Sequence, residues 1–595
     1  MSATKPNESV KRRNKNLLNN SEQEFVASRR NTVLQSLKKL KIQCSRKEVP
    51  NIALLGSGGG QRAMVGLLGS LVQLDKAGLL DCILYLSGVS GSTWCMASLY
   101  KEPNWSTKLE TVKDKIIERM SGPGVSWGDA LTKLKKYYYG KDFFSLTDVW
   151  AVMAVTSYVK EIDEHTLTEQ RNQHNKDPFP IYAVIDKQSK QSNDGDPWFE
   201  INPYEAGYSL SGVFVDTGDF GSQFQKGSKN KHQDEFDMLY LQALCGSALG
   251  DEADIKKAMW QKIKDFFQNE NTLEAMRKEE REKIDELMRK KKETEGKEAE
   301  LESFSKPCPP DDPISLSVDE CHRALMDLVN MNISVLNGED PSGFDKSIRT
   351  NLNGLSGGKI QPIYKMKTEE TDDKRAEKRY TNRFSMDVCE YLSSRNSNWL
   401  VDIWISICKC MAEWIWGRKY NFLHNMTDEA VNSTLLQSET RDYIDAGMLL
   451  NSPYFSVLRE DRHIDLIISL DFSDGDPFMT INKASETCKK LKIPFPEVPS
   501  DEGKKPKDFY VFKGQNSPTV IHIPLFNAVN CGDKVEDWRK KYRTFQGAYS
   551  AEMIADLMDV AGKNISNNRE KLKEQIRVVI EEKRFGRFKK FLNKD

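Results

Sequence analysis

The sequence has no long uninterrupted apolar run. Its most apolar long segment, 399–416, contains Asp402, Lys409 and Glu413, which argues against a membrane-spanning helix. We expect a buried helix beneath a cap there, and a membrane-interface contact is the alternative because tryptophan favours interfaces. The polar amino terminus shows no signal-peptide pattern, so we expect any membrane contact to come from outside the bilayer.

The eleven cysteines include no Cys-x-x-Cys pair and no spacing typical of a metal site. Free thiols suit a reducing compartment, and we expect a cytoplasmic protein without a metal. Ser2 does not indicate myristoylation, and residues 592–595 contain no cysteine for prenylation. The 87 basic and 88 acidic residues give a net charge of -1, so no overall field attracts nucleic acid and we expect none as a partner.

A chain of 595 residues is long enough for several domains, but large α/β enzymes often form one. We expect a disordered segment at 1–20, one catalytic domain at 21–562 and a basic helical tail at 563–595. Within the domain, residues from about 263 to 312 are rich in lysine and glutamate. This composition predicts a solvated helix or a mobile insertion, and a lid is the alternative.

The segment from 49 to 100 predicts a βαβ unit. Apolar runs at 49–55 and 83–86 predict buried strands, and a helical pattern at 62–76 lies between them. A turn at Ser90 then leads into another helix towards Tyr100. Such a unit implies a parallel sheet.

The remaining pattern extends this α/β organisation. Residues 22–40 have apolar side chains at helical spacing, and 181–185, 198–201 and 466–470 are typical of strands. A final helix is expected from about Asn568.

Ser90 lies in a turn that suits a nucleophile. Gly88 and Gly91 flank it between an apolar strand and a helix, which permits the sharp elbow of serine hydrolases. Ser92 stands where the common elbow has glycine. The motif alone leaves a structural serine as an equal alternative.

A second loop, Gly58-Gly59-Gly60, also follows a strand and opens a helix. Free N–H groups in such a loop attract an anion, and its closeness to the first turn makes it a candidate oxyanion hole. No Gly-Lys-Ser/Thr follows, so a nucleotide loop is not indicated. Arg62, just after the loop, fits a salt bridge or a phosphate contact.

The base that would activate Ser90 is harder to identify. None of the seven histidines lies in a small-residue loop; they are His165, His174, His232, His322, His424, His463 and His522. His522 alternates with isoleucines on a probable strand, and His463 lies in a charged segment before one. Asp445, in the turn Ile444-Asp445-Ala446-Gly447, is the better candidate, although such turns are common.

Three motifs together resemble the active-site motifs of the group IV cytosolic phospholipases A2. They are Gly56-Ser57-Gly58-Gly59-Gly60-Gln61-Arg62, Gly88-Val89-Ser90-Gly91-Ser92 and Asp445-Ala446-Gly447. Similar stretches extend the resemblance over roughly 22–560, and it is strongest to the short members that lack a calcium-dependent lipid-binding module.

The resemblance implies an α/β fold: a patatin-like three-layer αβα central sheet with a helical, charged cap and a lid insertion. It implies a Ser90–Asp445 dyad, an oxyanion hole from Gly59 and Gly60, and binding of the substrate phosphate by Arg62. No cofactor is implied, and calcium is not required. The substrates would be phospholipids and lysophospholipids at a membrane surface, with acyl transfer as a further activity.

Two alternative functions remain open from the sequence. One is a Ser-His-Asp esterase of the α/β-hydrolase type with His522 as the base, and the other is a non-catalytic membrane-binding homologue. The tail at 583–592 alternates basic residues with phenylalanines and fits either an anionic membrane surface or a frayed end. We expect peripheral binding to intracellular membranes such as the endoplasmic reticulum, and the oligomeric state is left open.

Overall fold

The computed structural model describes most of the chain. The described residues are 10–12, 18–192, 196–247, 252–298, 316–352, 374–396, 398–428, 431–499, 505–544 and 546–592.

The strands of the described part are given in chain order. They are β1 (Val10–Arg12), β2 (Ile52–Gly56), β3 (Tyr85–Gly88), β4 (Phe179–Asp186), β5 (Trp198–Ile201), β6 (Glu205–Tyr208), β7 (Val213–Asp216), β8 (Gln223–Gln225), β9 (Ser228–Lys231), β10 (Arg418–Tyr420), β11 (Thr440–Asp445), β12 (Leu466–Asp471), β13 (Tyr510–Phe512) and β14 (Thr519–Pro524).

The α-helices cover both faces of the sheet and build a separate bundle. They are α1 (Asn20–Lys39), α2 (Gln61–Lys76), α3 (Gly91–Tyr100), α4 (Leu109–Ser121), α5 (Trp127–Gly140), α6 (Leu146–Trp150), α7 (Thr156–Val159), α8 (Lys187–Ser192), α9 (Met238–Cys245), α10 (Glu252–Phe267), α11 (Glu270–Glu298), α12 (Val318–Asn337), α13 (Ser342–Asn351), α15 (Lys374–Ser393), α16 (Trp399–Glu413), α17 (Ser433–Gln437), α18 (Tyr454–Val457), α19 (Met479–Leu491), α20 (Ala528–Cys531), α21 (Val535–Lys541), α22 (Ala551–Ser566) and α23 (Arg569–Leu592).

One large mixed sheet forms the centre of the molecule. Its order is β1-β7-β6-β5-β4-β3-β2-β12-β14-β13, and β11 joins β4 outside this path. The strands β4, β3, β2, β12 and β14 are parallel, as the βαβ pattern predicts. The run from β4 to β1 is antiparallel instead. Short connections such as residues 202–204 between β5 and β6 explain this, because only antiparallel neighbours can be joined by so few residues.

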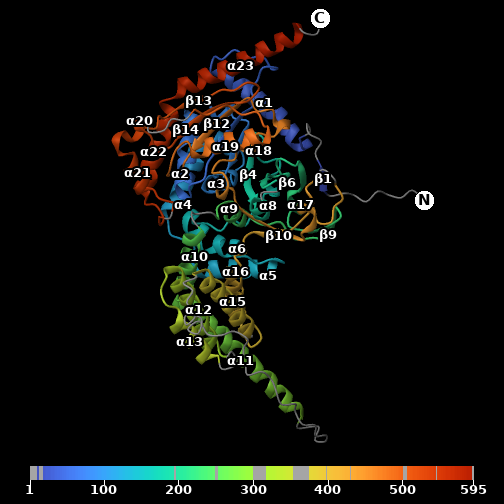
Figure 1. Ribbon diagram of the computed structural model, residues 1–595, viewed down its shortest axis with the longest axis vertical. Helices are drawn as coiled ribbons and strands as arrows, with labels where there is room; N and C mark the ends of the chain where they lie inside the picture. Colours follow the sequence, from blue (N-terminus) through green and yellow to red (C-terminus); the bar gives the residue numbers. More distant parts are fainter. Residues whose placement is uncertain are drawn as a thin grey trace, which may run out of the picture.

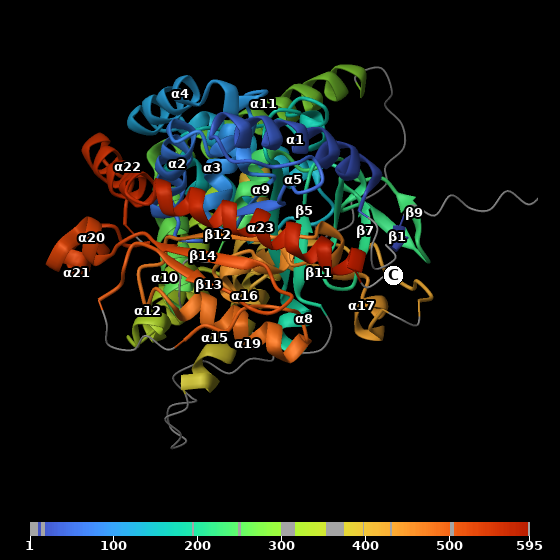
Figure 2. The ribbon, with the colours of Figure 1, turned by 90° about the horizontal axis from the view of Figure 1, so that it is seen from above.

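Side chains alternate across the central strands and fill a core on each face. Ile52 and Leu54 of β2 belong to one core, and Ala53 and Leu55 to the other. Helices α2 and α3 lie on one side of β12 and β14, and α19 lies on the other (Figure 2). The predicted three-layer αβα arrangement is therefore confirmed.

A helical bundle below the sheet in Figure 1 forms the cap. Helices α10, α12, α15 and α16 contact one another there, and α11 extends away from the body. The expectation of a buried helix at 399–416 matches α16, whose Leu400, Val401 and Trp404 are buried. The charged insertion is helical as far as Glu298, and residues 299–312 lie outside the described part. No helix among the described residues is long and apolar enough to cross a bilayer.

Near each end of the chain, the described residues form a regular element that packs on the domain. The expectation of disorder at 1–20 is wrong for Val10–Arg12, which pair with β7; residues 1–9 and 13–17 lie outside the described part. At the other end, α23 buries Leu572, Ile576 and Ile580. The tail helix is therefore docked along its first half.

Candidate active site

Ser90 occupies a sharp turn between β3 and α3. Its φ of 53° and ψ of -125° lie in a region that serine rarely adopts. Gly91 permits this turn, because a Cβ at Gly91 would lie 1.8 Å from the carbonyl oxygen of Gly60. The serine therefore has the geometry of a nucleophile elbow, and it is only 3% exposed.

The glycine loop connects β2 to the amino terminus of α2. Gly59 and Gly60 have φ values of 151° and 56°, which only glycine adopts easily. Their backbone N–H groups donate no hydrogen bond within the described residues. Free donors at the start of a helix are suited to a developing negative charge.

The two loops touch each other. The Ser92 hydroxyl donates to the Ser57 carbonyl at 2.6 Å, and a Cβ at Gly58 would lie 3.0 Å from the Cβ of Ser90. Ser92, the departure from the common elbow, thus ties the serine turn to the glycine loop.

Strand register brings Asp445 to the same level as Ser90. On one edge of β4, β3 ends with Gly88 opposite Tyr182. The other edge of β4 pairs with β5. Strand β11 therefore pairs with β4 on the same edge as β3, beyond the end of β3, with Asp445 opposite Val184. Val184 is two residues beyond Tyr182, just as Ser90 is two residues beyond Gly88.

Asp445 is fully buried and held at the end of β11. Its Oδ1 accepts a hydrogen bond from the Gly447 N–H at 2.7 Å. Its own backbone N–H donates to the Ser247 hydroxyl at 3.3 Å. These contacts fix the carboxylate in a small-residue turn next to the serine elbow.

Asn451 is a site residue that the sequence analysis missed. Its side-chain Nδ2 donates to the Gly58 carbonyl at 3.2 Å and to the Ser473 hydroxyl at 2.8 Å, and its backbone carbonyl accepts from the Gly58 N–H at 3.0 Å. Asn451 thus clamps the glycine loop. Its only sequence signal is its position six residues after Asp445.

The two histidines weighed as bases lie away from Ser90. Through β12 and β2, His522 is in register with Ser87, three strands away, which corresponds to about 14 Å. Its Nε2–H donates to the Pro477 carbonyl at 2.6 Å. His463 precedes β12, at the opposite end of the parallel strands from Ser90.

Arg62 is buried, and its guanidinium already has acceptors. It donates to the carbonyls of Phe472 at 2.6 Å and Tyr542 at 2.5 Å. It also contacts Asp474 at 3.3 Å and Thr544 at 3.2 Å. Asp474 is the one carboxylate among these four acceptors, and its side chain is 46% exposed, so it is the acceptor that a substrate phosphate would replace most easily.

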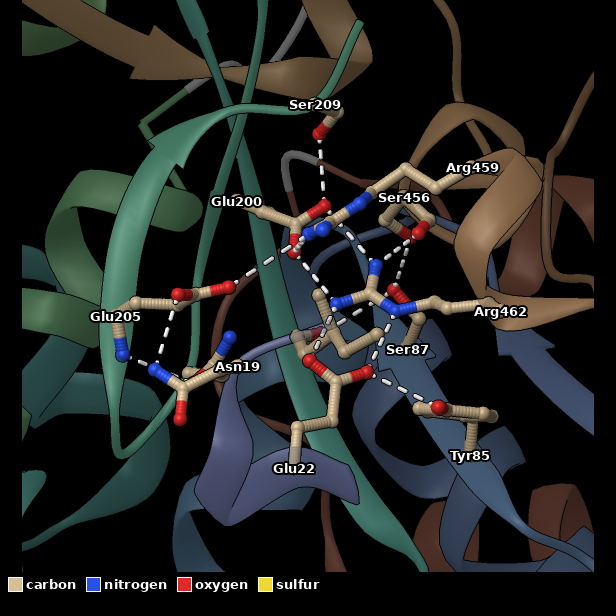
Figure 3. Close-up of polar contacts among 12 residues, drawn as sticks. Asn19, Glu22, Tyr85, Ser87, Glu200, Glu205, Ser209, Ser456, Arg459 and Arg462 are labelled. Carbon is tan, nitrogen blue, oxygen red and sulfur yellow. Dashed lines mark hydrogen bonds and ion pairs between the residues drawn. The ribbon is translucent and has the colours of Figure 1, made fainter. Parts of the chain in front are cut away.

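A buried ionic network lies on the amino-terminal side of the serine strand (Figure 3). Arg462 forms bidentate contacts with Glu200 at 2.6 and 3.0 Å and with Glu22 at 2.9 and 3.2 Å. Glu22 also accepts from the Tyr85 hydroxyl at 3.0 Å. Because Tyr85 begins β3, the network anchors the strand that carries Ser90.

Known proteins are similar to this chain in sequence. Residues 52–306 match the family described as "Lysophospholipase catalytic domain". The chain is 32% identical to cytosolic phospholipase A2 gamma of Mus musculus, over 94% of this chain and 91% of that protein. It is 30% identical to the Homo sapiens protein of the same name, over 94% of each.

A solved structure supports the fold. Human GIVD cytosolic phospholipase A2 superposes with a TM-score of 0.61 at 21% identity, over 96% of this chain and 68% of that one. Another structure of that protein holds the inhibitor methyl gamma-linolenyl fluorophosphonate. The sequence identity and its coverage show that the chain belongs to the cytosolic phospholipase A2 family.

Proposed function

We propose that this enzyme hydrolyses the sn-2 ester of glycerophospholipids with Ser90 as nucleophile and Asp445 as general base. The observation that carries the proposal is the strand register that sets both residues at one level on the edge of β4. The inhibitor printed for the related GIVD structure is a fluorophosphonate, a class that reacts with activated serines.

In the first half of the reaction, Asp445 takes the proton from the Ser90 hydroxyl as Oγ attacks the ester carbonyl. The N–H groups of Gly59 and Gly60 stabilise the negative oxygen, and each such donor contributes about 3–4 kcal/mol. The C2–oxygen leaving group takes the proton from Asp445. Lysophospholipid departs and an acyl-serine remains.

In the second half, water attacks the acyl-serine and Asp445 takes its proton. Collapse releases the fatty acid and returns the proton to Ser90. A lysophospholipid hydroxyl in the place of water would give acyl transfer, and lysophospholipid in the first half would give lysophospholipase activity.

We propose that Arg62 binds the substrate phosphate by exchanging Asp474 for it. The charges that these steps need all come from residues of this chain, so the reaction is proposed to proceed without calcium. We place the enzyme in the cytoplasm, peripherally on intracellular membranes such as the endoplasmic reticulum.

An exposed apolar side chain at the end of α23 supports the proposed membrane contact. Phe585 is 68% exposed there. The neighbouring Lys583 and Arg584 instead contact Asp465 at 2.5 Å and Glu48 at 3.0 Å on the catalytic domain. The apolar side chain, rather than these two cations, is available to a lipid surface.

Fluorophosphonate labelling tests the proposed nucleophile. We expect the wild-type protein to be labelled on the peptide that contains Ser90, and Ser90→Ala to lose the label. Ser98→Ala, at a buried serine of the helix α3 that follows Ser90, should retain it. An unlabelled wild-type protein that is correctly folded would support the non-catalytic alternative.

A further inference from the structure

We propose that a cavity between β10, α5 and the start of α9 binds a phosphate monoester through Lys419 and Lys141. The cavity has a volume of about 240 Å³, many times the ~10–15 Å³ that one water needs by the same measure. Lys133, Lys141, Asp237 and Arg418 also line it. It uses none of Ser90, Asp445, Gly59, Gly60 or Arg62.

Among the described residues, Lys419 is the lining cation that forms no ion pair with a carboxylate. Its side chain is 7% exposed. Its ammonium group makes no hydrogen bond or ion pair with the described residues, and it lies 4.2 Å from the ring of Tyr240 and 5.3 Å from that of Phe236. A buried ammonium without an anionic partner is costly, so an anion from solution would stabilise it.

The other lining cations have carboxylate partners. Lys133 contacts Asp237 at 2.5 Å and Glu164 at 2.6 Å. Arg418 contacts Asp442 at 2.8 Å.

The lining carboxylates also have partners, but not all of these partners are cations. Asp142 accepts from Lys231 at 2.6 Å, and Glu235 accepts from the Thr168 N–H at 3.0 Å. Asp234 lines the cavity as well, but its side chain is 94% exposed and 3.5 Å from His232, so water solvates its charge. Within the described part of the chain, Lys419 is therefore the lining cation without a carboxylate partner, and Glu235 is a lining carboxylate bonded to Thr168 rather than to a cation.

Lys141 brings a second cation to the same point. Its ammonium lies 3.4 Å from the Tyr240 ring, whose neighbourhood it shares with Lys419. Lys141 pairs with the fully buried Asp148, and the next nearest carboxylate, Asp237, is paired with Lys133. Lys141, Lys419 and Asp148 together leave one net positive charge, which the negative charge of a bound phosphate group would neutralise.

The protonation of Lys419 is consistent with a missing anion. Burial, and then the charge of Lys141, lower the pKa of Lys419 to about 7, against the opposing pull of Asp148 and Asp237. A bound anion favours the protonated amine. Binding should therefore weaken as the pH rises from 7 to 9.

The cavity is built on the elements that hold the proposed base. Lys419 on β10 pairs with Arg441 on β11, and Arg441 lies four residues before Asp445 on that strand. On the other side of the cavity, α9 is followed by Ser247, whose hydroxyl accepts from the Asp445 N–H. A ligand there would stabilise the position of β11.

Titration calorimetry tests the site with inorganic phosphate and glycerol 3-phosphate on the full chain. We expect one site per chain, and at least ~10-fold weaker binding in Lys419→Met, since a hydrogen bond to a charged group contributes about 1.5–3 kcal/mol. Lys419→Arg should bind. Lys229→Met is the control, because Lys229 pairs with Asp219 outside the cavity lining.

A vesicle arm distinguishes a soluble ligand from a lipid headgroup. Ser90→Ala, which leaves the lipid intact, is mixed with phosphatidylcholine vesicles with and without phosphatidic acid. If only phosphatidic acid gives binding that depends on Lys419, the ligand is a lipid headgroup. If neither probe shows dependence on Lys419, the proposal is overturned. If Lys419→Met does not fold, the same binding measurements are made with Lys141→Gln, which should also bind phosphate more weakly than wild type.

Discussion

The backbone at Ser90 adopts a conformation with positive φ that a serine occupies only under constraint. The constraint is visible on both sides of the residue. Gly88 ends β3 opposite β4, and Gly91 packs against the Gly60 carbonyl. Such strain costs about 1–3 kcal/mol and tends to occur at functional sites.

This strain predicts an unusual order of stability. Ser90→Gly is expected to unfold at a higher temperature than Ser90→Ala, by the equivalent of about 1 kcal/mol, because glycine tolerates the positive φ. Both variants should be inactive. At Ser70, in the middle of α2, the order should reverse, because glycine destabilises a helix. Equal melting temperatures of the two Ser90 variants would contradict the strain.

At the scale of elements, the network in Figure 3 connects α1, β5 and the 3-10 turn Glu460–Arg462. Burial by itself raises the pKa of Glu200, but the charges of Arg462 and Arg459 outweigh it, and the pKa lies below its ordinary value. A carboxyl group of this kind stabilises the fold above its unfolded pKa, and this contribution is lost as the pH falls through the folded pKa.

Acid unfolding measures this contribution. We expect the wild-type protein to lose stability as the pH falls from 5 to 3, and Glu200→Gln to lose less over the same range. At pH 7 the variant should be less stable by about 3–5 kcal/mol, since it leaves buried arginine charge uncompensated. Glu497→Gln, at an exposed position, is the control. If wild type and Glu200→Gln lost the same stability between pH 5 and 3, the network would not be the source of the acid sensitivity.

The end of α23 makes a second prediction at this scale. Phe585→Ser should weaken binding to phosphatidylcholine–phosphatidylserine vesicles by about tenfold, because a phenylalanine leaves water on binding. Met479→Ser, at the start of α19, removes a side chain of similar exposure, 56%, and should have no effect. Vesicle sedimentation measures both. An unchanged affinity in Phe585→Ser would remove α23 as the contact.

At the scale of the whole molecule, the parallel half of the sheet was predictable because its signals are local. The strand at 49–55, the helix at 62–76 and the strand at 83–86 correspond to β2, α2 and β3, each within three residues at its ends. Buried parallel strands have continuous apolar runs, and glycine-rich turns mark their carboxyl ends.

The contacts that assemble the site were not predictable from such signals. Asn451 reaches Gly58 across 393 residues, and Arg62 reaches the Tyr542 carbonyl across 480. The pairing of β11 with β4, beyond the end of β3, also depends on tertiary packing. Local sequence patterns identify candidate residues, and only the fold shows which of them lie on the same edge of strand β4.

The central claim is that an aspartate, with no histidine, activates Ser90. Release of sn-2 fatty acid from phospholipid vesicles, measured for folded Asp445→Asn and His522→Ala side by side, tests it most directly. We predict that Asp445→Asn loses activity by about 10²–10⁴-fold and that His522→Ala retains it. An inactive His522→Ala beside an active Asp445→Asn would contradict the dyad.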